Sequence, residues 1–356
     1  MRHGVIMAGG AGVRLWPLSR KQRPKQILKL FGGKSLLRQS FERVTAVLEP
    51  ERVYVITNDQ HLSMVAEELP EIPRDNLIGE PVGRDTANAV GLSAGMIAER
   101  DPEAVIGMFT ADHIITPVDQ FRRSVLRAFE TAEQHPDALV TMGIRPSRPD
   151  TNYGYIRRGE SIAPGVFEVK KFTEKPSVAT AMRYLASGEY YWNSGMFTWR
   201  ACTILDELQK HLPQSFEAIR RICETEGKAE RKALLEKLYP DLLKISIDFA
   251  VMERASRVLA VEMDCQWVDV GSFPALESVV EGDRDGNISV CERVVHLGSR
   301  GNIVVSEERH LIATIGVEDL VIVHSPDATL ICKRRDATAI KELVDNIRAE
   351  FGEEYI

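Results

Sequence analysis

The first stretch that could do chemistry is a glycine-rich loop followed by cations. Residues 5–26 read VIMAGGAGVRLWPLSRKQRPKQ, in which a short apolar strand leads into three glycines. Glycines let the backbone approach a ligand closely, and exposed N–H groups suit phosphate oxygens. Arg14 and Lys25 follow, separated by a proline-stiffened segment, as a clamp on a polyphosphate requires. We therefore expect a nucleoside triphosphate to bind here.

This loop differs from the two best-known glycine motifs. It is not a P-loop, because Leu28 stands where the GGKS at Gly32–Ser35 would need its first glycine. It is not a dinucleotide fingerprint either, because Leu15 replaces the third glycine of GxGxxG. A plain strand-to-helix turn is the alternative for the glycines alone. The cations that follow them favour phosphate binding.

Two carboxylates accompany apolar strands further along the chain. Asp112 comes just after the apolar run 105–109, and Asp269 lies in WVDVGS, an apolar run closed by glycine. Two such carboxylates can hold one Mg²⁺, which prefers oxygen ligands and phosphates. A helix cap or turn former is the alternative for Asp112. We interpret His113 as structural rather than as a metal ligand.

Four further segments carry groups that suit a nucleobase and a sugar phosphate. Glu80, in EPVGRDTANAV, offers a carboxylate that matches the N1–H and N2–H₂ donors of guanine. Gly154, in NYGYI, allows close backbone approach. Glu174 and Lys175 place a hydroxyl acceptor beside a phosphate cation, and Asn193 adds an amide that suits hydroxyl groups. A surface loop is the alternative for Glu80, and a hairpin or strand end is the alternative for the others.

Alternating strands and helices are expected to position these groups. Candidate strands and helical patterns alternate over the first part of the chain, at 5–7, 36–48, 53–57, 85–99, 105–109, 121–133 and 139–144. Asp85 is a plausible N-cap for the second helix. The alternation predicts an α/β fold with a Rossmann-like mixed, mostly parallel sheet and helices on both faces. In such sheets ligands bind at the carboxyl ends of strands.

The sequence changes character near residue 284. Residues 287–332 hold short β-rich runs separated by turn residues, and residues 336–351 form an amphipathic helical pattern. We therefore divide the chain into a catalytic domain, 1–284, and a C-terminal domain, 285–356. The second is expected to be a small all-β unit, a short left-handed β-helix-like stack, with a terminal helix. The apolar face of that helix offers a homodimer contact, with packing inside the chain as the alternative.

Composition and charge exclude several classes of protein. The chain has 356 residues, 44% of them hydrophobic, and its net charge of −7 disfavours a general nucleic-acid surface. Five scattered cysteines form no CxxC pair, and the histidines show no ligand spacing, which argues against a disulfide framework or a zinc site. No apolar run is long enough to span a membrane, and the N-terminus lacks a secretory pattern. We expect a cytoplasmic protein without nucleic-acid or membrane partners.

As an ordered set, these motifs resemble those of the hexose-1-phosphate nucleotidylyltransferases, and among them the mannose-1-phosphate guanylyltransferases. The shared segments, between residues 7 and 273, are AGG-G-RLWPLSR with PKQ, EP-RDTA, ADH, NYGYI, EKP, NSGMF, SID-AVME and W-DVGS. The resemblance implies transfer of GMP from GTP to mannose 1-phosphate, with Mg²⁺ as cofactor. The nearest alternative keeps this chemistry with a heptose or glucose 1-phosphate, or with another nucleotide. A non-catalytic sugar-nucleotide sensor is disfavoured, because the phosphate cations and the metal carboxylates are all present.

The resemblance also implies a role for each candidate residue. The residues implied to be catalytic, with the two aspartates as Mg²⁺ ligands, are Arg14, Lys25, Asp112 and Asp269. Those implied to bind the nucleotide are Ala8, Gly9, Gly10, Gly12, Glu80, Arg84, Asp85 and Thr86. Those implied to bind the sugar phosphate are Gly154, Glu174, Lys175 and Asn193. Within SIDFAVME, Asp248 and Glu253 are expected to support the site from behind.

The sequence departs from the family pattern at a few positions. Val13 stands where the family usually has threonine, which removes a hydroxyl near the triphosphate. Thr110 replaces a common proline, and Phe249 and Phe273 replace tyrosine and tryptophan. Because little sequence follows the terminal helical pattern, we expect the form without the sugar-phosphate isomerase domain that longer members append.

Overall fold

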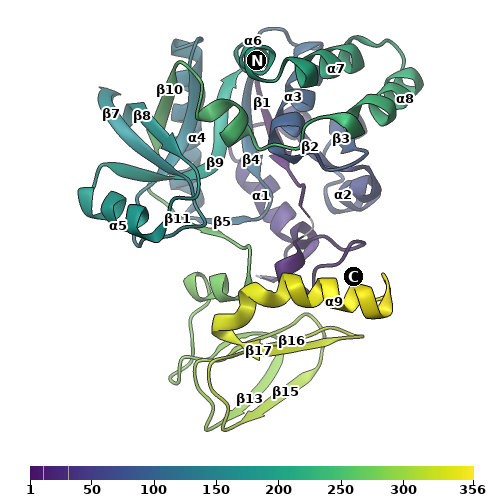
Figure 1. Cartoon of the computed structure of the whole chain (residues 1–356), viewed down its shortest axis with the longest axis vertical. Coiled ribbons are helices and arrows are strands. Elements are labelled where there is room, and N and C mark those ends of the chain that lie inside the picture. Colours follow the sequence, from purple (N-terminus) through teal and green to yellow (C-terminus); the bar gives the residue numbers. More distant parts are fainter. Residues whose placement is uncertain (11, 31) are drawn as a thin grey trace. The chain divides into compact units, whose positions relative to one another are not determined.

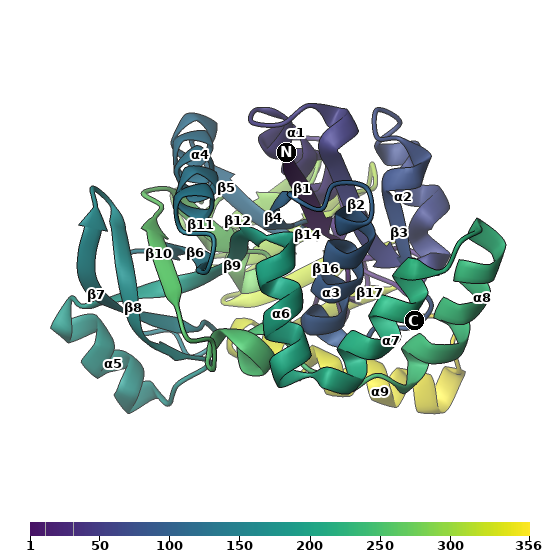
Figure 2. The same cartoon turned by 90° about the horizontal axis from the view of Figure 1, so that it is seen from above.

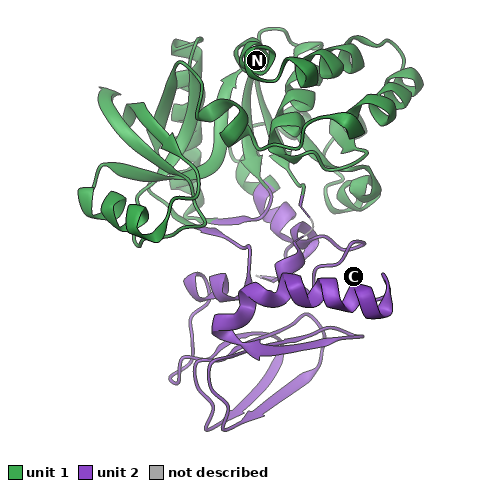
Figure 3. Ribbon diagram, in the orientation of Figure 1, with its two compact units in different colours: residues 1–9, 41–110, 115–267 green, residues 10–40, 111–114, 268–356 purple. Residues whose placement is uncertain are grey.

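The computed structural model describes residues 1–10, 12–30 and 32–356, which fall into two compact units (Figure 3). Unit 1 consists of residues 1–9, 41–110 and 115–267, and unit 2 of residues 10–40, 111–114 and 268–356. Unit 2 therefore gathers three distant parts of the sequence. The boundary predicted after residue 284 lies where the pattern of the sequence changes, whereas these two units are defined by which residues contact one another.

Unit 1 is built on a nine-stranded mixed sheet with the strand order β3-β2-β1-β4-β9-β6-β10-β8-β7. These strands are β1 (Arg2–Met7), β2 (Val53–Asn58), β3 (Leu77–Glu80), β4 (Val105–Thr110), β6 (Leu139–Ile144), β7 (Tyr155–Ala163), β8 (Val166–Thr173), β9 (Tyr190–Arg200) and β10 (Val258–Glu262). The pairs among β3, β2, β1 and β4 are parallel, and so is β6 with β10. The sheet becomes mixed because β9 runs antiparallel between β4 and β6, and β8 and β7 extend it antiparallel.

Helices cover both faces of this sheet (Figures 1 and 2). The helices up to residue 238 are α1 (Leu36–Thr45), α2 (Leu62–Glu68), α3 (Asp85–Ala98), α4 (Val118–Gln134), α5 (Val178–Ser187), α6 (Ala201–His211), α7 (Pro213–Glu224) and α8 (Lys228–Leu238). Helix α4 packs on β4, β6 and β9, while α3 and α6 lie on the opposite face. Gly91 and Gly95 allow α3 to pack closely on its neighbours, because a Cβ there would lie 2.9 Å from Ile219 and 2.8 Å from Cys223. The predicted α/β architecture is confirmed.

Unit 2 contains the C-terminal strands and the last helix. Its elements after residue 284 are β12 (Ile288–Val290), β13 (Arg293–Leu297), β14 (Ile303–Ser306), β15 (Leu311–Ile315), β16 (Leu320–His324), β17 (Thr329–Lys333) and α9 (Ile340–Phe351). Strands β12, β14 and β16 pair in parallel, as do β13 and β15, while β17 pairs antiparallel with β16. Parallel pairing between strands one coil apart produces a β-helix-like stack, as predicted.

One apolar core joins the N-terminal loop to these strands. We call residues 12–30 the basic loop. It contributes Leu15, Leu18 and Leu28 to a buried cluster that also contains Val305 of β14 and Val323 of β16. The apolar face of α9 packs on the same core, so the alternative expectation for this helix, packing inside the chain, is the one observed.

Candidate functional site

Unit 2 brings together the four residues that were expected to be catalytic. Lys25 forms an ion pair with Asp112. Burial opposes the charge on Lys25, but the carboxylates of Asp112 and Asp269 outweigh it and raise the pKa of the ammonium. Arg14 faces the same place, because a Cβ on Gly271 would lie 3.4 Å from its Nη2 and 3.6 Å from Asp269 Oδ1. Two cations and two carboxylates thus form one cluster.

The carboxylates of Asp112 and Asp269 lie close together because the strands next to them pair with each other. Asp112 lies in the turn between β4 and β5 (His113–Thr116), and Asp269 ends β11 (Gln266–Asp269). Strand β5 pairs with β11, and the N–H of Val270 donates to the carbonyl oxygen of Asp112 at 3.2 Å. The pairing therefore sets two residues side by side that are distant in the sequence.

The donors in this cluster fit a divalent metal ion. Nε2 of His113 lies 3.6 Å from Asp112 Oδ1 and 3.9 Å from Asp269 Oδ1. Ligand atoms of these three residues lie within 4.8 Å of one another. Burial opposes ionisation of Asp112, but Lys25 and His113 overcome it and hold the pKa of the carboxyl below its ordinary value. The carboxyl group of Asp112 is therefore ionised near neutral pH.

Glycines let the start of the basic loop fold against Lys25. Gly12 has a φ of 59°, in the left-handed region that glycine adopts without strain. A Cβ there would lie only 2.7 Å from Lys25 Cβ and from Ser19 Oγ. Gly10 has a φ of 103°, and its carbonyl accepts a hydrogen bond from Gln26 Nε2 at 3.5 Å. The side chain of Val13, where the family usually has threonine, packs at the edge of the apolar core.

Unit 1 holds the group of residues expected to read the base. Glu80, at the end of β3, is buried, and Tyr239 donates a hydrogen bond to its Oε1 at 2.6 Å. Burial raises the pKa of Glu80 to about 7, although the hydrogen bonds from Tyr239 and from the backbone of Arg84 lower it. Gly9 faces this carboxylate, since a Cβ there would lie 3.9 Å from Glu80 Oε2. Ala8 precedes it and donates its N–H to Ile56 of β2 at 2.8 Å.

The prediction of Asp85 as an N-cap is wrong. Helix α3 begins at Asp85 itself, and its N-cap residue is Arg84, which makes no side-chain capping bond. Asp85 has a φ of 66°, which turns its carboxylate onto the next residue, where Oδ1 accepts from the N–H of Thr86 at 2.8 Å. The hydroxyl of Thr86 accepts from the N–H of Ile247 at 2.8 Å. Thr86 therefore ties α3 to the segment that precedes Asp248.

The residues expected to hold the sugar also meet in unit 1. The N–H of Asn193 donates to the carbonyl oxygen of Gly154 at 2.8 Å, and its Nδ2 donates to Asp248 Oδ1 at 2.9 Å. The N–H of Glu174 donates to Glu253 Oε1 at 3.1 Å. The two acidic residues of SIDFAVME, Asp248 and Glu253, therefore contact Asn193 and Glu174.

The charges in this group are unevenly exposed. Lys175 is exposed and donates to Glu174 Oε1 at 2.6 Å. Asp248 is partly buried, and desolvation, followed by the charge of Glu174, raises its pKa to about 7. Gly154 faces Glu174 so closely that a Cβ there would collide with Oε2. A larger residue at this position would therefore displace the carboxylate of Glu174.

Two residues in these groups are not among the site residues that the sequence predicts. His113 was interpreted as structural, yet its ring lies near both carboxylates of the cluster. The Ala-Asp-His sequence itself was the available signal. Tyr239 reaches Glu80 across 159 residues of sequence. No local pattern around Tyr239 indicates this contact, because only the packing of the helices near α8 brings the hydroxyl there.

Comparisons with known proteins match both the fold and these motifs. Residues 3–286 match the family profile described as nucleotidyl transferase, and residues 292–347 match the MannoseP isomerase/GMP-like beta-helix domain. The mannose-1-phosphate guanylyltransferase of Escherichia coli K12 is 42% identical over 99% of this chain and 74% of its own length. A putative mannose-1-phosphate guanylyltransferase of Vibrio cholerae is 38% identical over 99% of this chain and 75% of its own.

A solved structure gives the same result for the fold. A protein from Thermus thermophilus, described as a mannose-1-phosphate geranyltransferase, is 36% identical. It superposes with a TM-score of 0.89 and covers 98% of this chain and 99% of its own. The chain therefore belongs to the nucleotidyl transferase family, within the group of proteins named mannose-1-phosphate guanylyltransferases.

Proposed function

We propose that this chain transfers GMP from GTP to mannose 1-phosphate, forming GDP-mannose and pyrophosphate. The observation that carries the proposal is the cluster of Arg14, Lys25, Asp112 and Asp269 in unit 2. Such a cluster can bind a polyphosphate and a cation at once. The names of relatives at 38% to 42% identity agree with this activity.

The reaction needs positioning and charge neutralisation more than proton transfer. An oxygen of mannose 1-phosphate attacks the α-phosphorus of GTP, and the bond from that phosphorus to the pyrophosphate oxygen breaks in line. The nucleophile is already an anion near neutral pH, because the second pKa of a phosphate monoester is about 6. No general base is required. Arg14 and Lys25 bind the triphosphate and neutralise the charge that develops on the leaving group.

We assign Asp112 and Asp269 as the ligands of Mg²⁺, with His113 beside them. Two carboxylates suit this hard cation, which usually keeps several waters and binds phosphate oxygens as well. When bound, Mg²⁺ would neutralise phosphate charge between the two substrates. The ion pair with Lys25 uses Asp112 Oδ2, which leaves Oδ1 for the cation. The arrangement of the acidic residues thus supports a divalent cation, and the donor chemistry supports magnesium.

The remaining candidates are assigned to the two substrates. Glu80 would accept hydrogen bonds from guanine, with Gly9, Arg84, Asp85 and Thr86 shaping its surroundings. The backbone of Ala8, Gly10 and Gly12 would line the triphosphate. Gly154, Glu174 and Asn193 would hold the sugar hydroxyls, and the exposed Lys175 would hold the sugar phosphate.

The test is a pyrophosphate-release assay with Mg²⁺ across the four nucleoside triphosphates and several sugar 1-phosphates. We expect the highest kcat/KM for GTP with mannose 1-phosphate. A higher value for glucose or heptose 1-phosphate would change the assigned sugar, and a higher value for ATP or UTP would change the assigned base. Absence of turnover with every pair, in a protein that still binds GTP, would favour a sugar-nucleotide sensor.

We also propose that residues 1–284 form a catalytic domain and that residues 285–356 form a C-terminal domain. The C-terminal domain would provide the contact of a homodimer. The apolar face of α9 is buried inside unit 2, so the exposed side chains of β13 and β15 are the better candidates for the dimer contact.

No helix among the described residues is long and apolar enough to cross a membrane. A cytoplasmic location remains an expectation based on the cysteine pattern.

A further inference from the structure

The basic loop carries two of the proposed catalytic cations but has little regular structure of its own. Over residues 16–24, all of which the structure describes, it has neither helix nor strand. A single bridge joins Arg20 and Arg23, whose backbones exchange hydrogen bonds of 2.9 and 3.0 Å. Rates of group transfer depend steeply on the placement of the charged groups. Something outside the loop must therefore hold Arg14 and Lys25 in position.

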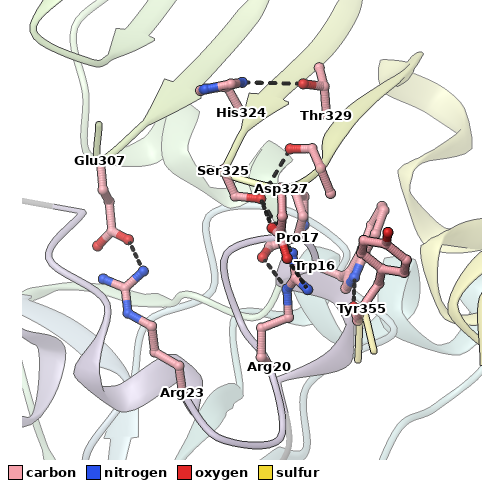
Figure 4. Close-up of polar contacts among 11 residues, drawn as sticks. Trp16, Pro17, Arg20, Arg23, Glu307, His324, Ser325, Asp327, Thr329 and Tyr355 are labelled. Atoms are coloured by element: carbon pink, nitrogen blue, oxygen red, sulfur yellow. Dashed lines mark hydrogen bonds and ion pairs between the residues drawn. The ribbon is translucent and has the colours of Figure 1, made fainter. Parts of the chain in front are cut away.

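The first anchor of the loop is Arg20, which lies between the two cations (Figure 4). Its guanidinium binds Asp327 through both oxygens, with Nη2–Oδ1 at 2.6 Å and Nη1–Oδ2 at 3.2 Å. Nη2 also donates to Ser325 Oγ at 3.3 Å, and Nε donates to the carbonyl oxygen of Pro17 at 2.8 Å. Both Asp327 and Ser325 lie in the turn between β16 and β17. One guanidinium therefore fixes the curve of the loop and attaches it to the C-terminal strands.

The second anchor is Glu307, just after β14. Its Oε2 lies 2.7 Å from Arg23 Nη1 (Figure 4). Its Oε1 accepts a hydrogen bond from the backbone N–H of Lys29 at 2.7 Å. These contacts hold the loop on both sides of Lys25. A third contact runs from Trp16 Nε1 to the carbonyl oxygen of Tyr355, at 2.6 Å.

The same C-terminal core supports the other half of the cluster. Ile114 follows His113, and Val270 follows Asp269. The side chains of Ile114 and Val270 are buried in the same apolar cluster as residues of β14 and β16. The segments that carry Arg14, Lys25, Asp112 and Asp269 thus share one core with the β-helix-like stack. Asp327 and Glu307 also pair with Arg20 and Arg23, whereas Lys25 pairs with Asp112 and Arg14 lies near Asp269.

We propose that Arg20, Glu307 and Asp327 are positioning residues for nucleotidyl transfer, through which the C-terminal strands hold the triphosphate-binding cations in place. The proposal rests on the proposed function for the role of Arg14 and Lys25. It gives the C-terminal strands a part in the reaction within one chain, separate from any role in dimerisation.

The test is a double-mutant cycle with Arg20→Gln, Asp327→Asn and the double variant, and Glu307→Gln as an independent second anchor. We expect each single variant to lose about tenfold in kcat/KM for GTP, since small displacements of charged groups cost rates of this order. KM for mannose 1-phosphate should change by less than about twofold, because the loop does not hold the sugar. Because Arg20 and Asp327 act as a unit, the double variant should be no worse than the poorer single variant. Glu318→Gln is the matched control. Oε1 of Glu318 lies 3.2 Å from Nε of Arg300, and this ion pair does not involve the basic loop.

Calorimetric titration with GTP and with inorganic triphosphate, without sugar phosphate, separates this proposal from the proposed function. Weaker binding of both probes to the anchor variants supports positioning even if wild-type protein has no transferase activity. A wild-type protein that binds neither probe would overturn it. Variants with a lowered melting temperature but unchanged kcat/KM and affinity would also overturn it, because the anchors would then only stabilise the fold.

Discussion

At the scale of single residues, the cation–carboxylate cluster is a balance of opposite charges in which Lys25, Asp112 and Asp269 are partly buried and Arg14 is exposed. Removing one carboxylate leaves Lys25 with an incomplete counter-charge, and it would leave the proposed Mg²⁺ with one anionic ligand fewer. We predict that Asp112→Asn and Asp269→Asn each lower kcat by at least on the order of 10²-fold, the scale of one preorganised charge contact. The measurement is pyrophosphate release under saturating substrates. Asp264→Asn, an exposed neighbour in the sequence, should leave the rate unchanged, and a normal rate in either cluster variant would contradict the assignment.

Glu80 gives a prediction that depends on pH. Its pKa is raised to about 7, so a rise from pH 6 to pH 8 takes the ionised fraction from about a tenth to about nine tenths. Only the ionised carboxylate accepts from both N–H donors of guanine. The ratio of kcat/KM for GTP to that for ATP should therefore increase by about tenfold over this range. Using the ratio cancels the titration of the phosphates, which both nucleotides share.

Two variants check this interpretation. Glu80→Gln cannot ionise, so its GTP-to-ATP ratio should be low and independent of pH. Tyr239→Phe removes a hydrogen bond that lowers the pKa of Glu80, so the midpoint of the pH profile should move upward. A wild-type ratio that is flat between pH 6 and pH 8 would place base recognition elsewhere.

At the scale of elements, an asparagine pair stabilises the β-helix-like stack. Asn302 is fully buried, and its Nδ2 donates to Asn287 Oδ1 at 2.9 Å and to Val317 O at 3.0 Å. Its Oδ1 accepts from the N–H of Leu320 at 3.0 Å. We predict that Asn302→Ala lowers the free energy of unfolding by roughly 1–3 kcal/mol, because it leaves buried partners unsatisfied. Chemical denaturation should show this loss, while the exposed Lys341→Ala should differ little from wild type.

The sequence indicates most of these elements but not their pairing. Apolar runs and helical periodicity place β1, β2, β4, β6, α3 and α4 to within a few residues. The short β3 and α2, with four and seven residues, were not predicted, and neither was α5. The antiparallel insertion of β9 between β4 and β6 was not predicted either. Local sequence patterns determine which segments form strands. The order of the strands in the sheet depends instead on which apolar faces pack against one another in the folded protein.

At the scale of the whole molecule, an exposed apolar face is the best candidate for self-association. In β13 and β15, Val295, Leu297, Leu311 and Ile315 are 57%, 64%, 57% and 74% exposed. Leu297 is opposite Ile315 in the register, so these side chains lie on one face of the strand pair. Apolar patches of this kind commonly mark an interface.

We therefore predict a dimer that Leu297→Lys and Ile315→Lys convert into a monomer, as measured by size-exclusion chromatography with light scattering. Leu343→Lys, on the partly exposed side of α9, is the control and should keep the wild-type mass. A monomeric wild-type protein, or a dimer broken by Leu343→Lys alone, would contradict this prediction.

The sequence by itself determined the chemistry that each segment can do. The glycines of the loop, the cations after them and the carboxylates after the strands follow from residue type and local spacing, which do not depend on the rest of the fold. Only the tertiary structure decided which groups meet: Tyr239 with Glu80, Asp248 with Asn193, and Arg20 and Arg23 with the C-terminal carboxylates. These contacts join residues far apart in the chain, and they exist because burial of apolar side chains from distant segments brings those segments together within each unit.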